Sequence, residues 1–170
     1  MTGPQDAEAL REVQAPLKRR YRDDPAAALI TLEAEGELDE GIACSVQTGR
    51  ALVKAGLHAG TGGDGLLACS GDMLLQALVA CAGVTLRSVA VNRGIELRGG
   101  RVVAEGDLDF RGTLGVGTEA PVGFRAVRLR FELDTPAADD EVAKLIATTE
   151  RYCVVLQTLT GGVPVDVAAI

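Results

Sequence analysis

The most regular pattern of apolar positions lies in the middle of the chain, between residues 70 and 93. Apolar residues recur there at intervals of three and four, which is the period of one helix face: Leu74, Leu75, Leu78, Cys81, Ala82, Leu86 and Val89. Ser70 and Asp72 suit the start of a helix, and Gly94 suits its end. Because nearly the whole segment is apolar, the pattern predicts a helix at the centre of a fold or between two subunits.

Shorter segments on both sides of this helix have strand-like patterns. The candidates, by composition or alternation, are residues 28–35, 42–47, 51–53, 101–110 and 126–133. Residues 36–41 form a hairpin-like spacer, and the glycine-rich run 56–65 predicts a loop. In 126–133, apolar residues alternate with charged ones, which is typical of a sheet with one solvated face.

A second helix is predicted to open at Thr135 and Pro136, with its apolar face on Val142, Leu145 and Ile146. It runs toward Cys153 and re-forms as a short helix that ends before the glycine pair at 161–162. Residues 163–167 are a candidate terminal strand. The order of strands, long helix, strands and helix predicts an α+β fold.

The domain organisation follows from the same pattern. Residues 1–25 are expected to form a helical extension, charged over 5–22 and followed by a turn, and residues 26–170 a single domain. A length of 170 residues suits one domain. Hydrophobic residues make up 47% of the chain and aromatic residues only 3%, so the core must be built from Leu, Val, Ile and Ala.

Charge and hydropathy exclude several classes of protein. The net charge of −7 argues against a general binder of nucleic acids or acidic membranes, which needs a surplus of Lys and Arg. No uninterrupted run of 18 apolar residues occurs, and the first ten residues are polar and acidic. We therefore expect neither a membrane span nor a secretory signal, and a cytoplasmic location.

Cysteines are the residues most open to a chemical role. The chain has four, none in a C-x-x-C pair, and one histidine, His58, which is too few for a usual zinc site. We expect no metal. A cysteine on a helix face is more often a small core residue than a nucleophile, so spacing alone leaves both roles open for Cys81 and Cys153. Cys44 and Cys69 are expected to be passive, and His58 to be an ordinary loop residue, with a role as base or pocket residue left open.

The sequences around two of the cysteines resemble motifs of a known protein family. Residues 70–85, SGDMLLQALVACAGVT, resemble the central-helix motif of the OsmC/Ohr family, in which an acidic residue and a Leu-Leu pair lead into Ala-Cys. Residues 150–153, ERYC, resemble the second cysteine site of that family. The resemblance runs from about Leu29 to the C-terminus, with elements in the same order.

The resemblance implies an intertwined homodimer in which antiparallel sheets wrap long central helices, with active sites at the subunit interface. It also implies a thiol peroxidase that reduces organic hydroperoxides. Cys81 would become a sulfenic acid and Cys153 would condense with it to a disulfide. An external dithiol, such as a lipoyl-linked one, would then restore the pair, so no bound cofactor is expected.

Two departures from the family pattern concern the support of the thiolate. The family pairs a glutamate at the helix start with an arginine from an N-terminal strand or loop. Here the acid is Asp72, and the first hairpin holds no basic residue. Arg50 is the first candidate for the arginine, followed by Arg20 or Arg22 and then Arg151. In addition, Cys153 is followed by Val154 where many relatives have proline.

Two readings other than the enzyme stay open. A binding module of the same fold would hold a small apolar or thiol ligand at the dimer interface without turnover. A dimeric scaffold would show neither ligand binding nor thiol loss. Thiol titration with cumene hydroperoxide separates them, because only the enzyme loses two thiols rapidly.

Overall fold

The computed structural model describes residues 36–38, 43–48, 51–115 and 119–169, and a few positions between 8 and 23. These few positions are helical, in agreement with the predicted N-terminal helix. The strand predicted at 28–35 and the domain boundary at residue 25 lie outside the described residues. The chain forms two compact units, one of Met1–Arg19, Ala77–Val103 and Leu129–Ile170, the other of Arg20–Gln76 and Ala104–Arg128.

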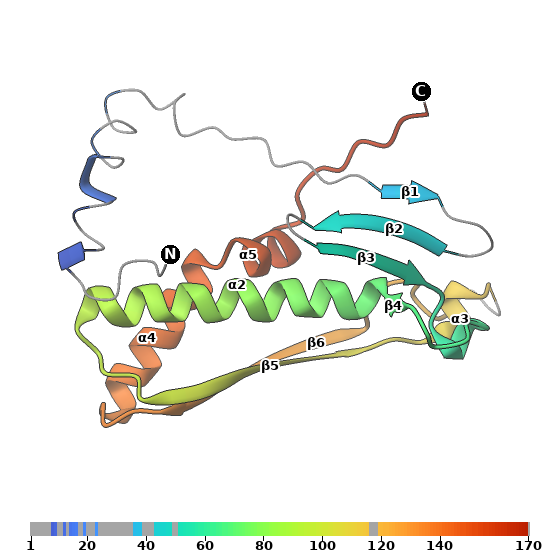
Figure 1. The fold of residues 1–170 in the computed structure, drawn as a ribbon. Helices are drawn as coiled ribbons and strands as arrows, with labels where there is room; N and C mark the ends of the chain where they lie inside the picture. Colours follow the sequence, from blue (N-terminus) through green and yellow to red (C-terminus); the bar gives the residue numbers. More distant parts are fainter. Residues whose placement is uncertain are drawn as a thin grey trace. The chain divides into compact units, whose positions relative to one another are not determined.

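A small sheet belongs to the second unit (Figure 1). Its strands are β1 (Gly36–Leu38), β2 (Ala43–Thr48), β3 (Ala51–Gly56) and β4 (Ala68–Cys69), in that order across the sheet. β1 and β3 flank β2 in antiparallel register, whereas β4 pairs with β3 in parallel. The spacer prediction for 36–41 is therefore wrong at its start, because Gly36–Leu38 pairs with β2 and only the residues after it connect the strands.

The predicted glycine-rich loop follows β3 and contains one short 3-10 helix, η2 (Ala59–Thr61). His58 caps this helix: its Nδ1 accepts a hydrogen bond of 2.9 Å from the Gly60 backbone N–H. The His58 ring also lies against Phe110, with 4.9 Å between ring centroids. These contacts give His58 a local structural role.

The long helix α2 spans Ser70–Arg93, as the periodicity predicts. It ends at Gly94, whose φ of +69° lies in the left-handed region that favours glycine. The Ile95 N–H closes the end with a 2.9 Å hydrogen bond to the Ala90 carbonyl. The first turns of α2 belong to the second unit and the rest to the first.

Two strands follow α2 and pair with each other: β5 (Gly99–Asp107) and β6 (Ala126–Asp134). Hydrogen bonds from Arg98 N to Asp134 O and from Arg125 N to Asp107 O show that they run antiparallel. The predicted strand 101–110 is too long, because a short helix α3 (Phe110–Thr113) begins at its end. The Asp109 side chain caps α3 by accepting from the Arg111 N–H at 3.2 Å.

The last part of the chain is helical, with one interruption. Helix α4 spans Asp139–Tyr152 and helix α5 spans Val154–Gly161, with Cys153 between them. The predicted opening at Thr135 is wrong by four residues, since α4 starts at Asp139. Residues 163–167 form no strand; their three valines are all exposed.

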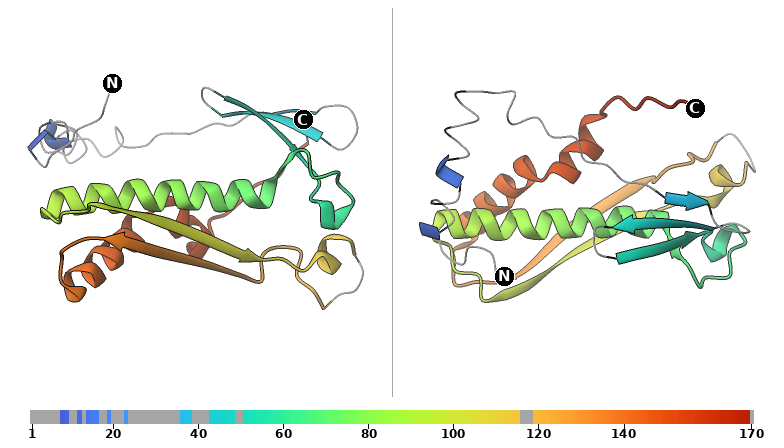
Figure 2. Two further views of the ribbon diagram at one scale, coloured as in Figure 1. Left: turned by 60° about the horizontal axis from the view of Figure 1, so that its bottom comes forward. Right: turned by 45° about the horizontal axis from the view of Figure 1, so that its top comes forward.

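The core of the first unit forms where α4 and the adjoining part of β6 lie beside α2 (Figures 1 and 2). Leu86 and Ala90 of α2 pack with Leu145 of α4, and Phe131 and Leu133 of β6 close the cluster. Leu145 is fully buried. One face of each predicted amphipathic element thus supplies the core.

Helix α2 bears on the expectation that the chain has no membrane span, which stays a prediction. An 18-residue window of this helix has a mean hydropathy of 1.8, so by length and composition it could cross a membrane. The core helix of a soluble protein passes the same test, and part of α2 packs into the core described above. Only 22% of the window is buried, and the rest of α2 is partly or fully exposed in the described part of the chain.

Candidate active site

The break between α4 and α5 positions Cys153. Its backbone has φ −74° and ψ 105°, an extended conformation that ends α4 and starts α5. The side chain is fully buried. Cys81 lies on α2, next to the fully buried Ala82, and its own side chain is partly exposed.

The structure brings these two cysteines together. The Cys153 thiol donates a hydrogen bond to the sulfur of Cys81, and both cysteines are free thiols. Residues 72 positions apart in the sequence therefore meet in one unit. Cys81 is thus the partly exposed member of the pair, and Cys153 the buried one.

Hydrogen bonds from α5 dominate the surroundings of Cys81. Burial alone raises the pKa of this thiol, but hydrogen bonds outweigh it and hold the pKa below its usual value of 9.0. The donors are the backbone N–H of Val155, the Cys153 thiol, the backbone N–H of Val154 and the Thr85 side chain. The first N–H groups of a helix have no partner within the helix and carry its positive end, so they favour a thiolate.

The pKa of Cys153 is shifted in the opposite direction. Burial raises its pKa, and the hydrogen bond and negative charge of Cys81 raise it further. Hydrogen bonds from the Leu156 and Val155 backbones oppose this and do not overcome it. At a given pH, Cys81 is therefore the more readily ionised thiol, and Cys153 is the one that keeps its proton.

The predicted arginine support is not seen among the described residues. Arg50, Arg20 and Arg22 lie outside them. Arg151 is described and exposed, and its guanidinium stacks over the Tyr152 ring at 5.5 Å. Asp72 is exposed in the first turn of α2, as predicted, and its pairing with Arg50 stays a prediction. Of the described groups that lower the pKa of Cys81, none is a guanidinium.

Sequence reasoning missed the donors that the structure provides. The donors at Val154 and Val155 are backbone N–H groups, so the side chains of these two residues do not indicate that they donate hydrogen bonds. The only signal was the helix break predicted at Cys153, which implies a new helix N-terminus directly after it. Thr85 was visible as a polar residue one turn after Cys81, on the same face of α2.

The other cysteines lie outside this pair. Cys69 ends β4 and is a partly buried free thiol of the second unit. Cys44 lies on β2, and its side chain is outside what the structure describes. In the described part of the chain, no group of three His, Cys, Asp or Glu side chains could hold a metal ion.

These features define the class of protein: an α+β fold with a pair of unlike thiols between a central helix and a helix break. The chain belongs to the OsmC-like protein family, whose model matches residues 63–168. The match includes Cys81 and Cys153. No curated protein matches the chain.

Solved structures of this family share the fold. An OsmC-like protein from Mycoplasma pneumoniae has a TM-score of 0.64 and 19% identity, with 78% of this chain and 89% of that one covered. An organic hydroperoxide resistance protein OsmC from Legionella pneumophila has a TM-score of 0.62 and 21% identity, with 79% of this chain and 92% of that one covered. An organic hydroperoxide resistance protein from Elizabethkingia anophelis has a TM-score of 0.58 and 17% identity, with 79% of this chain and 91% of that one covered. The family thus includes organic hydroperoxide resistance proteins.

Proposed function

We propose that this protein is a thiol-dependent peroxidase that reduces organic hydroperoxides through Cys81 and Cys153. The observation that carries the proposal is that the two neighbouring thiols have pKa values shifted in opposite directions. Cys81 is partly exposed with a lowered pKa, whereas Cys153 is buried, has a raised pKa and donates to the sulfur of Cys81. An attacking thiol needs the first set of properties, and a resolving thiol needs only proximity.

The reaction starts with attack of the Cys81 thiolate on the terminal oxygen of the hydroperoxide. The O–O bond breaks, and the alkoxide takes a proton and leaves as an alcohol. Cys81 is now a sulfenic acid. The sulfur of Cys153 loses its proton and attacks that of Cys81, which releases water and forms a disulfide. An external dithiol reduces this bond, becomes a disulfide itself and restores both thiols.

The amide groups of α5 act on the Cys81 thiolate at the first step. They stabilise negative charge on Cys81 before the attack and point at the sulfur without any rearrangement of side chains. This explains how a cysteine on an apolar helix stays reactive although the first hairpin holds no basic residue. Asp72 with Arg50 would add to this support when the arginine reaches the site.

We further propose that the working form is a homodimer in the cytoplasm. Only 22% of the apolar window of α2 is buried, and Val84, in the middle of the helix, is 72% exposed. A second copy would cover this surface, with a total buried area above roughly 2,000 Å² as in permanent interfaces.

The organic hydroperoxide resistance proteins from Legionella pneumophila and Elizabethkingia anophelis, which share this fold, support the proposed redox role.

Thiol loss tests the proposal. Reduced protein is treated with a slight excess of cumene hydroperoxide and its free thiols are titrated, followed by peptide mapping. We expect rapid loss of two thiols and a Cys81–Cys153 disulfide. Cys153→Ser should leave Cys81 open to overoxidation to sulfinic acid, while Cys69→Ser serves as the matched control and should react as the unaltered protein does.

Two outcomes would remove the proposal. Intact thiols after treatment would favour a binding module of the same fold or a scaffold. A Cys69–Cys153 disulfide would contradict the assignment of Cys81 as the attacking residue.

A further inference from the structure

The backbone hydrogen bonds of α4 and α5 change partners at the break between the two helices. The Cys153 N–H still donates to the Thr149 carbonyl at 2.9 Å, four residues back, as in an α-helix. In a continuous helix the next N–H, that of Val154, would donate to the Glu150 carbonyl. Here the Val154 N–H donates to the sulfur of Cys81 instead. The break therefore supplies a donor to Cys81 and takes one from the end of α4.

Gln157 donates to the carbonyl that the Val154 N–H leaves. Its side-chain Nε2 donates to the Glu150 carbonyl at 2.9 Å, across the break. Its backbone N–H donates to the Cys153 carbonyl, also at 2.9 Å. Only the NH₂ end of a carboxamide can donate to a carbonyl, so this contact fixes the orientation of the side chain. Gln157 thus joins α5 both to the last turn of α4 and to the residue at the break.

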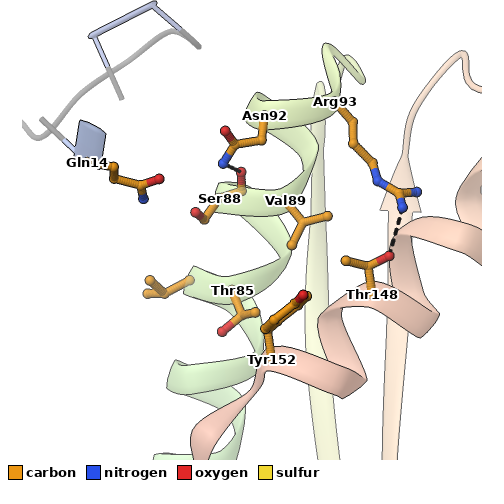
Figure 3. Close-up of a pocket in the computed structure, with 9 residues that line it drawn as sticks. Gln14, Thr85, Ser88, Val89, Asn92, Arg93, Thr148 and Tyr152 are labelled. Carbon is orange, nitrogen blue, oxygen red and sulfur yellow. Dashed lines mark hydrogen bonds between the residues drawn. The ribbon is translucent and has the colours of Figure 1, made fainter. Parts of the chain in front are cut away.

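The end of α4 lies at the turn of α2 that follows Cys81. Tyr152, the last residue of α4, and Thr85 of α2 line one cavity (Figure 3). Thr85 also hydrogen-bonds to Cys81. If α4 continued without a break, the Val154 N–H would point back along the axis of α4, away from the sulfur of Cys81.

We propose that Gln157 is a positioning residue for the cysteine pair: it bonds to the Glu150 carbonyl and so leaves the Val154 N–H to Cys81. Two arrangements compete for this N–H, a continuous helix in which it donates to Glu150 and a broken one in which it donates to Cys81. The Gln157 side chain favours the broken helix, because it satisfies a carbonyl that the break leaves without its helical partner. The inference rests on the proposed function, in which the Cys81 thiolate is the attacking group.

The test is the pH dependence of Cys81 alkylation by iodoacetamide, measured on the reduced full-length protein by mass spectrometry of the Cys81 peptide. Gln157→Met removes the donor and keeps the length and the helix propensity of the side chain. We expect the alkylation midpoint to rise by roughly half a pH unit, since the loss of one hydrogen bond shifts an equilibrium by that order.

Thr160→Val is the matched control. The Thr160 Oγ1 donates to the Leu156 carbonyl at 2.9 Å, so this variant also loses one bond from a side chain to the backbone, but within α5 and not across the break. Its alkylation midpoint should equal that of the unaltered protein. Both substitutions exchange neutral residues, so they leave the charges around Cys81 unchanged.

A double substitution separates positioning from a general stabilisation of α5. Val154→Pro removes the N–H for which the two arrangements compete, and the proline ring clashes with the carbonyl four residues before it, so the helix stays broken without Gln157. When it is combined with Val154→Pro, Gln157→Met should therefore add no further rise in the midpoint.

Three outcomes would overturn the proposal. One is an unchanged midpoint in Gln157→Met, and another is an equal rise in Thr160→Val. The third is a rise of the same size with and without Val154→Pro, because Gln157 would then act independently of the Val154 N–H.

Consumption of cumene hydroperoxide is measured separately, since alkylation needs no peroxide. If the midpoints respond as expected and no hydroperoxide is consumed, the proposed function fails and the positioning role of Gln157 stands. If hydroperoxide is consumed and the midpoint of Gln157→Met is unchanged, only the positioning role is overturned.

Discussion

Replacement of Val154 by proline would test how the Cys81 thiolate is supported. Val154 is the first residue of α5, a position where proline is well tolerated because the missing N–H has no acceptor within the helix. The preceding residue must be extended, and Cys153 already has φ −74° and ψ 105°. The substitution therefore removes one amide donor to Cys81 while the helix is expected to stay in place.

The expected effect is a rise in the pKa of Cys81. A hydrogen bond to a charged group contributes roughly 1.5–3 kcal/mol, and the low end applies because sulfur is a weak acceptor and Cys81 is partly exposed. Since one pKa unit corresponds to about 1.4 kcal/mol, the rise should be about one unit. The Val155 amide and the Thr85 side chain keep their contributions.

The assay is the pH dependence of Cys81 alkylation by iodoacetamide, followed by mass spectrometry of the Cys81 peptide. Val154→Ala is the matched control, because it shortens the same side chain and keeps the N–H. In the control and in the unaltered protein the alkylation midpoint should lie below that of free cysteine, because the pKa of Cys81 is lowered. If Val154→Pro and Val154→Ala have the same midpoint, the Val154 amide does not support the thiolate and the reasoning is refuted.

Three further predictions follow from packing and charge. Val84→Asp places a charge in the exposed middle of α2 and should shift the protein from dimer to monomer in sedimentation at micromolar concentration; a monomer before substitution would contradict the proposed dimer. Leu145→Ala removes a fully buried core side chain and should lower the free energy of unfolding in urea by about 2–5 kcal/mol. The hydrogen bond from Arg111 lowers the pKa of Asp109 from 3.8 to about 2, so its stabilising contribution is present above pH 3.8 and is lost as the pH falls toward 2. The melting temperature should therefore fall less steeply with falling pH in Asp109→Asn than in the unaltered protein. An equally steep fall in the two proteins would exclude the contribution of Asp109.

The sequence alone determined the elements whose pattern is local. The period of three and four over 70–93 and the alternation over 126–133 each report which side chains face a core, so α2 and β6 were predicted within a residue or two. The family resemblance, confirmed by the match to residues 63–168, supplied the fold, and it also supplied Cys81 and Cys153 as candidate site residues. Gly94 was predicted as the end of α2 because few other residues suit its backbone conformation.

Only the tertiary structure decided what depends on contacts between distant segments. Gly36–Leu38 became a strand because β2 offers it a partner, whereas 163–167 found none among the described residues and formed no strand. The donors to Cys81 are backbone groups of α5, and an N–H is the same in every residue except proline, so no side-chain pattern could reveal them. Arg93 and Thr148, 55 residues apart, meet only because α4 packs against α2. Periodicity tells which face of an element is buried, but not which face of another element will cover it.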